Sequence, residues 1–405
     1  MTTRLVLLTH DYPFNGGDAS FVRHEIDAIA ARFDEVIVFS YARTERPIRT
    51  DLPANVSHGG NLYGSDYTQS LLAVLSPTAL GTLGRVVRAE RRAGRIKGNA
   101  RRLILAALLG MRIARHPGLR RALTEPGTRV TVYSFWGMGA ALSLPWLPAV
   151  AGGAFLRLHR YDLYEEESGY LPFRRSLFAS SSRILAISED ARRYLLERYP
   201  DAGLDARITV NRLGTADVAP ASRPARQETR TLVSCSGITP VKQVGRILDG
   251  LALLAPAEPV RWIHFGDGPL RDELRLRVEQ ARIDGVHVEL RGAVDNEDLL
   301  AFYATNRVDV FLNVSASEGV PVSIMEAMSF GIPVIATRVG GTPEIVGPEL
   351  GSGELVGEAA EATELADAIK AMLDKPDSAY DARAAWERLC DARVTSAALA
   401  DLMAG

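Results

Sequence analysis

The chain has 405 residues, 47% hydrophobic and 24% charged, with a formal net charge of −2. This length exceeds what one core usually serves, so we expect two domains in a globular protein. The sequence has no run of eighteen apolar residues, so we expect no membrane-spanning helix, and its N-terminal apolar stretch is too short for a secretory signal. With only two cysteines, Cys235 and Cys390, a disulfide framework is not expected and a cytoplasmic location is favoured.

In the first half, apolar strand patterns alternate with helical patterns, which favours parallel sheets covered by helices. We expect helices at 20–33 and 189–199 and strands at 4–10, 35–42, 130–135, 154–160, 183–188 and 208–213. Gly16 and Gly17 follow the first of these strands. Paired glycines allow close approach of the backbone to a ligand, although any tight turn also uses them.

A basic insertion interrupts this alternation. Residues 85–121 contain twelve Lys or Arg and one acid, Glu90. Apolar side chains are interleaved with the charge: Leu103, Ile104, Leu105, Leu108, Leu109, Met111 and Ile113. A basic amphipathic segment predicts contact with an anionic membrane surface, and the alternative is a solvated basic helix face. Nucleic acid is not an expected partner, because no aromatic stacking pattern accompanies the charge.

His159 comes at the end of the strand expected at 154–160. A histidine in such a place is often only a structural residue with satisfied hydrogen bonds. The acidic run Glu165–Glu167 follows shortly after, and we expect it to be solvated surface.

Residues 218–230 are rich in Pro, Ala and charge and read as a linker. A second alternation follows, with a helical tail over 379–403. Its expected strands are 231–236, 261–267, 286–292, 308–314 and 333–339, and its expected helices are 245–254, 269–283, 296–304 and 364–374. The predicted organisation is therefore a first domain at 1–217, a linker at 218–230, a second domain at 231–380 and a tail at 381–405.

Two carboxylates, Glu318 and Glu326, stand eight positions apart just after the strand expected at 308–314. Glu318 lies in a Ser-Ala-Ser-Glu-Gly turn, and we expect Pro321 to be the first residue of a helix that carries Glu326. A helix N-terminus offers free N–H groups to an anion. Two acids beside an anion site suit a ligand with phosphates in the middle and hydroxyls at both ends, as in a nucleotide-sugar. Each acid by itself would more often be plain surface.

This segment, from Val314 to Val346, resembles the Glu-x7-Glu signature of retaining GT-B glycosyltransferases, specifically glycosyltransferase family 4. The resemblance implies an α/β fold of two Rossmann-like domains that face each other across a cleft, with a C-terminal helix that crosses back to the first domain. It implies that Glu318 contacts the donor sugar and Glu326 the ribose. The backbone between them would bind the sugar or diphosphate, through Gly319, Val320, Pro321 and Val322.

The resemblance extends to other positions. Lys242 matches the lysine that binds donor phosphate. Gly237 stands where the family often has an arginine, and Arg246 is a candidate to replace that cation. Gly16 and Gly17 match the N-terminal glycine-rich loop, and His159 matches a histidine near the sugar. Gly268 and Val294 would line the pocket for the nucleotide base. The pattern Gly266-x-Gly268 fails as a dinucleotide fingerprint, because Arg271 replaces its third glycine.

The function implied is a retaining hexosyltransferase with a UDP- or GDP-linked donor and no cofactor. Its acceptor would be a glycan or a lipid-linked glycan, in surface polysaccharide or glycolipid assembly, at the inner face of the cell membrane. Lys242 would offset the negative charge of the leaving nucleoside diphosphate. Because the sequence has no DxD pair and no His/Cys cluster, we expect no metal. The alternatives are a non-catalytic nucleotide-sugar-binding protein and a GT-B relative with other chemistry, an epimerase or a phosphorylase.

Overall fold

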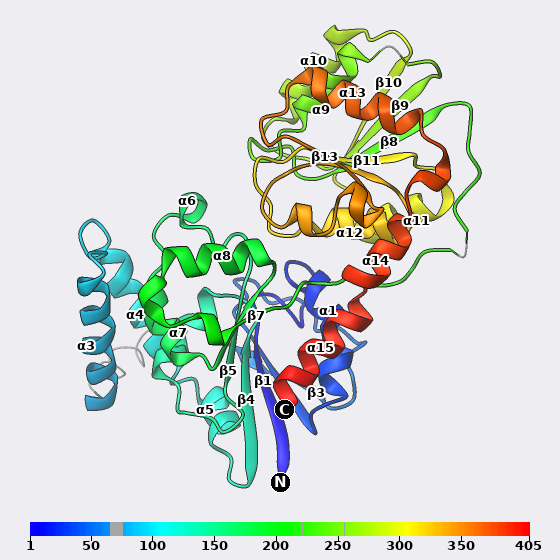
Figure 1. The fold of residues 1–405 in the computed structure, drawn as a ribbon. Helices are drawn as coiled ribbons and strands as arrows, with labels where there is room; N and C mark the ends of the chain where they lie inside the picture. Colours follow the sequence, from blue (N-terminus) through cyan, green and yellow to red (C-terminus); the bar gives the residue numbers. More distant parts are fainter. Residues whose placement is uncertain (65–75, 221, 255) are drawn as a thin grey trace. The chain divides into compact units, whose positions relative to one another are not determined.

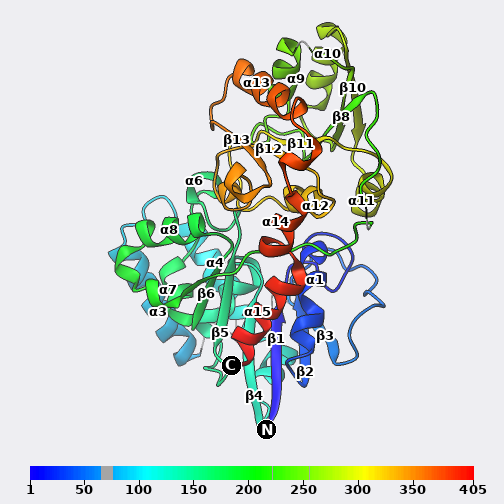
Figure 2. The ribbon, with the colours of Figure 1, turned by 45° about the vertical axis from the view of Figure 1, so that its right-hand side comes forward.

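The computed structural model describes the whole chain apart from residues 65–75, 221 and 255. The chain forms two compact units. The first contains Met1–Asn211 together with Ser396–Gly405, and the second contains Arg212–Thr395. Each unit is a parallel sheet with helices on both faces (Figures 1 and 2).

The first unit is built on a seven-stranded parallel sheet with the order β3-β2-β1-β4-β5-β6-β7. Its inner strand β1 ends in a nearly continuous apolar run, as is typical of parallel strands that are buried on both faces. Leu5, Val6 and Leu7 of β1, for example, have no exposed surface. The strands are β1 (Thr2–Leu8), β2 (Glu35–Ser40), β3 (Val56–Asn61), β4 (Thr128–Ser134), β5 (Ala154–Leu158), β6 (Arg183–Ala186) and β7 (Ile208–Val210).

Helices cover both faces of this sheet (Figure 1). One face packs against the helices α3 (Pro77–Arg92), α4 (Ala100–Ile113), α5 (Pro117–Thr124), α7 (Arg174–Ser180) and α8 (Glu189–Arg198). The short helix α6 (Glu165–Ser168) precedes α7, and α1 (Ala19–Ala30) follows β1. The basic insertion is therefore helical, and its apolar residues divide. Leu103, Met111 and Ile113 are buried in the core, whereas Ile104, Leu105 and Leu108 are exposed.

The second unit repeats the plan with a six-stranded parallel sheet in the order β10-β9-β8-β11-β12-β13. Its strands are β8 (Arg230–Cys235), β9 (Val260–Phe265), β10 (Val286–Gly292), β11 (Val310–Asn313), β12 (Val334–Thr337) and β13 (Gly353–Val356). One hydrophobic core lies under α9 (Gly245–Leu253), α10 (Arg271–Ala281) and α13 (Ala362–Leu373). The other lies under α11 (Asn296–Thr305), α12 (Val322–Ser329) and α14 (Ala382–Leu389).

The chain ends in the helix α15 (Ala392–Ala404), whose last turns belong to the first unit. There the Ser396 hydroxyl donates to the carbonyl of His24, and the Arg129 guanidinium donates to the carbonyl of Ala404 at 2.9 Å. The predicted return of a C-terminal helix to the first domain is thus confirmed. The two units divide between Asn211 and Arg212, and β8 begins at Arg230.

No helix in the described part of the chain is long and apolar enough to cross a membrane.

Candidate functional site

In both units, the predicted site residues follow the carboxyl ends of strands. Lys242 lies in the loop after β8, and Glu318 lies in the loop after the neighbouring strand β11. In open parallel sheets, ligands bind outside these strand ends, at the point where the strand order reverses. In the second sheet that point lies between β8 and β11.

An ion pair joins these two loops. The Lys242 ammonium lies 2.6 Å from Glu318 Oε1, and Glu318 is 5% exposed. Asn313 Nδ2 donates to the same carboxylate oxygen at 3.3 Å. The backbone reinforces the contact, because the Ala316 N–H donates to the carbonyl of Val241 at 2.8 Å. A carboxylate this well buried requires such partners.

The turn between the two acids is also buried. Gly319 and Val320 are inside, and the Gly319 carbonyl accepts from the Gly341 N–H at 2.7 Å. Pro321 is the N-cap of α12, with φ −70° and ψ 117°, and the helix begins at Val322. Our placement of Pro321 as the first helical residue was wrong by one position. The free N–H groups of the first helical turn therefore belong to Val322 and the residues after it.

Gly340 is a residue of this site that sequence reasoning missed. Its φ is +51°, and a Cβ there would lie 1.9 Å from the carbonyl oxygen of Glu318. Only glycine combines this conformation with such a close approach. The Gly-Gly pair after the predicted strand 333–339 was the available signal.

Glu326 lies on α12 and is partly buried. Its carboxylate accepts from Asn296 Nδ2 at 2.8 Å, and Asn296 is the first residue of α11. Cys235, at the end of β8, is close enough that the charge of Glu326 contributes to its thiol pKa, which burial raises to about 12. Asn296 was also missed, because a polar residue at a helix start is usually only a cap.

The remaining predicted donor residues have local explanations. A Cβ on Gly268 would lie 2.5 Å from the carbonyl of Ile238, so Gly268 lets its loop pack against the loop of Lys242. Val294 is 39% exposed, shortly before α11. The Arg246 guanidinium donates to Gln243 Oε1 at 2.6 Å and to the carbonyl of Glu358 at 3.0 Å. Arg246 is thus engaged away from the Lys242–Glu318 pair.

In the first unit, Gly16 and Gly17 are exposed in the loop after β1, with φ +104° and +52°. The organising residue there is the buried Asp18, which sequence reasoning missed. Its carboxylate accepts from the N–H groups of His10, Asp11 and Tyr12 and from Trp136 Nε1, at 2.7 to 2.9 Å. The signal was an Asp just before a helix, where a carboxylate is favoured.

His159 follows β5 and is 7% exposed, with its ring centroid 4.3 Å from that of Trp136 and 4.8 Å from that of Phe135. Burial, followed by the charge of Arg157, holds the pKa of His159 well below its usual value, so the imidazole is neutral. Asp162 fixes the backbone, because its carboxylate accepts from the N–H of His159 at 2.6 Å and from that of Gly137. Burial raises the pKa of Asp162 to about 6.

The expectation that Glu165–Glu167 form solvated surface was wrong for Glu165. Its side chain is 10% exposed and accepts from Arg95 at 2.6 Å, from Arg198 at 2.8 Å and from the Tyr199 hydroxyl at 2.7 Å. Burial alone would raise the pKa of Glu165, but these donors lower it. Glu165 therefore holds the basic insertion to α8.

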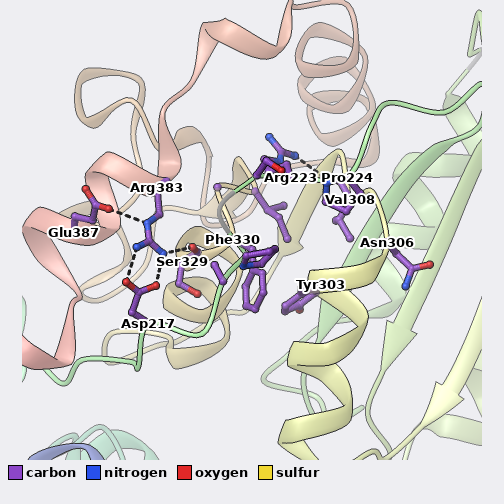
Figure 3. Close-up of a pocket in the computed structure, with 15 residues that line it drawn as sticks. Asp217, Arg223, Pro224, Tyr303, Asn306, Val308, Ser329, Phe330, Arg383 and Glu387 are labelled. Carbon is purple, nitrogen blue, oxygen red and sulfur yellow. Dashed lines mark hydrogen bonds and ion pairs between the residues drawn. The ribbon is translucent and has the colours of Figure 1, made fainter.

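A pocket of about 610 Å³ lies away from the carboxyl ends of the strands of the second sheet, around the start of β11 and the end of α12 (Figure 3). There Arg383 forms ion pairs with Asp217 and Glu387, at 2.8 and 2.9 Å. None of the predicted site residues lines this pocket. Within the described residues, no group of three or more His, Cys, Asp or Glu is placed to hold a metal ion.

Comparison with known proteins agrees with this geometry. Residues 217–388 match the family model of glycosyl transferases group 1. The chain is 28% identical over 277 residues to the WcaL protein of Escherichia coli strain K12, a glycosyltransferase assigned to colanic acid biosynthesis, covering 65% of this chain and 64% of that protein. It is 30% identical over 231 residues to WcaL of Salmonella typhimurium, covering 54% and 55%. The chain thus spans less than two thirds of the length of these relatives.

Among solved structures, the lipopolysaccharide outer core galactosyltransferase WaaB matches with a TM-score of 0.64 at 16% identity, over 96% of both chains. HepE of Anabaena, in complex with UDP and glucose, matches with a TM-score of 0.63 at 17% identity, over 99% of both chains. At such identities the likeness establishes the fold, which is GT-B. The part of the chain that matches the family model of glycosyl transferases group 1 contains the loops of Lys242 and Glu318 and the helix of Glu326.

Proposed function

We propose that the chain transfers a hexose from a UDP- or GDP-linked donor to a hydroxyl of a glycan or lipid-linked acceptor, with retention of anomeric configuration. One observation carries this proposal. Glu318 is buried 2.6 Å from the Lys242 ammonium, at the carboxyl ends of two adjacent strands. A diphosphate-linked sugar offers both groups a partner, because the ammonium suits the phosphates and the carboxylate suits sugar hydroxyls.

On this proposal, the second unit binds the donor. Lys242 passes from Glu318 to the diphosphate, and the N–H groups at the start of α12 share the charge. The turn Gly319–Val322 holds the middle of the ligand. Glu318 then orients the sugar, while Glu326, held by Asn296, accepts from the ribose hydroxyls. Gly268 and Val294 would border the base.

The first unit would bind the acceptor. Gly16 and Gly17 would contribute to donor binding, and the neutral imidazole of His159 would contact the donor sugar or position the acceptor. The acceptor oxygen bonds to the anomeric carbon while the bond from that carbon to the phosphate oxygen breaks. The acceptor proton passes to the departing phosphate oxygen. Attacking and leaving oxygens then share one face of the sugar, which gives retention and relies on orientation and charge stabilisation.

We further infer a role in surface polysaccharide or glycolipid assembly. The assignment of WcaL to colanic acid biosynthesis supports this inference. The cytoplasm remains the proposed compartment, which is consistent with two cysteines that are both free.

A peripheral membrane contact would fit such an acceptor. On α4, Ile104 is 58% exposed and Leu105 55% exposed, beside the exposed Arg101 and Arg102. Apolar side chains with neighbouring cations suit the surface of an anionic bilayer. The double variant Arg101→Gln/Arg102→Gln should reduce flotation of the protein with phosphatidylglycerol vesicles. Unchanged flotation would count against the contact.

Calorimetric titration with UDP and with GDP, both in EDTA, tests the donor proposal. Binding of one nucleotide at micromolar concentration, with no metal present, would support it and would choose the donor series. Binding of neither would contradict it. The anomeric configuration of the product, read from NMR coupling constants, then tests retention. A product with inverted anomeric configuration would contradict the proposed mechanism.

A further inference from the structure

Five aromatic side chains form a continuous row along the carboxyl edge of the first sheet. Successive ring centroids lie 5.2, 6.1, 5.3 and 4.3 Å apart. The order of the rings follows the order of the strands β3-β2-β1-β4-β5, because each ring comes one or two residues after its strand. Five strands at their usual spacing span about 19 Å. The aromatic row, from β3 to β5, consists of Tyr63, Tyr41, His10, Trp136 and His159.

The aromatic row is not simply part of the core. Tyr63 is 38% exposed, and Tyr41, His10 and Trp136 are partly exposed. Only His159, at the β5 end, is buried. The surroundings of the rings therefore change from buried at the β5 end of the row to open at the β3 end. Contiguous aromatic surface at the ligand-binding edge of a parallel sheet is typical of a binding site.

The buried end of the row holds polar atoms without partners. Within the described chain, neither ring nitrogen of His159 has a hydrogen-bond partner, and the same is true of His10 Nε2. Buried polar groups in native proteins are nearly always satisfied, so these nitrogens need hydrogen-bonding partners other than the described side chains and backbone. A neutral imidazole needs both a donor and an acceptor, and a sugar hydroxyl can be either. A lipid chain would leave these atoms unsatisfied.

Two carboxylates hold this end of the row in place. Asp18 accepts from Trp136 Nε1 at 2.9 Å and from the N–H of His10 at 2.7 Å. Asp162 accepts from the N–H of His159 at 2.6 Å. Both are buried, and both point at donors within the protein rather than at solvent. Rings fixed in this way lose little freedom when a ligand arrives, which favours binding.

We propose that the aromatic row binds the acceptor as a linear chain of several sugar residues. The terminal sugar, which carries the attacking hydroxyl, lies beside Trp136 and His159, and the preceding sugars extend past His10 and Tyr41 to Tyr63. The electron-rich faces of the rings contact the polarised C–H groups of the sugars. This inference rests on the proposed function, which it deepens by making the acceptor an oligosaccharide rather than a small molecule or a bare lipid.

Calorimetry on the full chain tests the inference. The probes are oligosaccharides of one to five sugars, prepared by acid cleavage and delipidation of the surface polysaccharide of the source cell. We expect the affinity of the wild type to rise with each added sugar. Tyr63→Ala should lower the affinity for the longest fraction about tenfold and leave that for the single sugar unchanged, because one ring at the far end is lost. Tyr63→Phe keeps the ring and should behave as wild type.

Tyr161→Ala is the matched control, because Tyr161 is 59% exposed in the same unit and stands outside the aromatic row. Affinity that does not depend on chain length, or a Tyr63→Ala variant that equals the wild type, would overturn the inference. Titration with UDP and GDP separates it from the donor proposal. If a nucleotide binds but no sugar fraction does, the inference about the aromatic row is wrong and the donor proposal stands. If Tyr63→Ala weakens only binding to phosphatidylglycerol vesicles, the occupant is lipid and the inference is also wrong.

Discussion

The two sheets have the same strand order around their central strand, yet their carboxyl edges carry different chemistry. The edge of the second unit presents opposite charges and amides, namely Lys242 with Glu318 and Asn296 with Glu326. The edge of the first unit presents aromatic rings and unpartnered imidazole nitrogens. The fold therefore supplies a place for ligands in both units, and the loop residues decide which ligand each place accepts.

The difference also determines what binding must replace. In the second unit, Lys242 and Glu318 are already partners, so the proposed donor would have to replace this contact with its own phosphates and hydroxyls. In the first unit, the carboxylates of Asp18 and Asp162 face backbone and indole N–H groups. Ring surfaces and imidazole nitrogens are the groups of the aromatic row that a ligand can contact. A charged donor thus suits the second unit, and an uncharged sugar chain suits the first.

Glu318→Gln should give the largest effect on turnover. The amide keeps the shape but loses the charge that orients the sugar at the transition state, so we expect sugar transfer to slow about 100-fold. Nucleotide affinity should hold or improve slightly, because Lys242 is released. Steady-state rates and calorimetry on the same preparation measure both. Glu273→Gln, on the exposed side of α10, is the control. An unchanged rate would remove Glu318 from its proposed role.

Glu326→Ala should weaken nucleotide binding by about 1 to 3 kcal/mol, since hydrogen bonds to a charged group are lost. Asn296→Ala should weaken it less, because Asn296 acts through Glu326, 2.8 Å away. Calorimetry with the nucleoside diphosphate and with the nucleoside alone measures both variants. Equal losses for the two ligands would place the contact on the nucleoside, as proposed. A loss confined to the diphosphate would contradict the ribose assignment.

Local sequence was sufficient to predict the strands and the helix around Lys242, Glu318 and Glu326. The strand at 231–236 is a short apolar run, and the pair Glu318 and Glu326 lies within a single strand–turn–helix segment. Such features depend on near neighbours, so pattern and spacing predict them well. The edge strands β3 (VSHGGN) and β13 (GELV) were missed, because they contain glycines and polar residues where a strand pattern needs alternating or continuous apolar side chains.

The edge of the first unit could not be found in this way. Only His159 of the aromatic row was predicted, because the other four rings come from separate loops and meet only through the strand order of the sheet. The same reason explains the error at Glu165. Three consecutive acids look like solvated surface, and nothing local indicates that Arg95, seventy positions earlier, is the partner of the first.

Acidification offers a comparison of the units, because each holds a histidine whose pKa burial lowers from 6.5 to about 4. These are the partly buried His24 in the first unit and the buried His264 in the second. The folded state favours the neutral ring. The stabilisation that each histidine contributes is therefore fully present above pH 6.5, and it is lost as the pH falls toward 4. Each histidine should cost about 2 kcal/mol of unfolding free energy at pH 5 relative to pH 7.

Denaturant unfolding at the two pH values measures this loss. His24→Gln should reduce the loss in the transition of the first unit by this amount and leave the part due to His159, and His264→Gln should reduce the loss in the transition of the second unit. His287→Gln replaces a ring that is 72% exposed and serves as the matched control. If either variant kept the full acid-induced loss, titration of that histidine would not be its cause.

Gly237→Arg should produce the smallest effect and, unusually, a gain. The site lacks the arginine that the family often has here, yet nothing in the structure requires glycine. A Cβ would lie 3.5 Å from the Asp267 carbonyl oxygen and 3.6 Å from Thr239 Cγ2, both ordinary contacts. An added guanidinium at a partly solvated diphosphate should tighten nucleotide binding about fivefold, and less at high salt. Calorimetry of the diphosphate against the monophosphate, with Gly237→Ala as control, measures the gain. If arginine and alanine bind alike, the loop after β8 does not face the diphosphate, and the donor would have to contact Lys242 from another side.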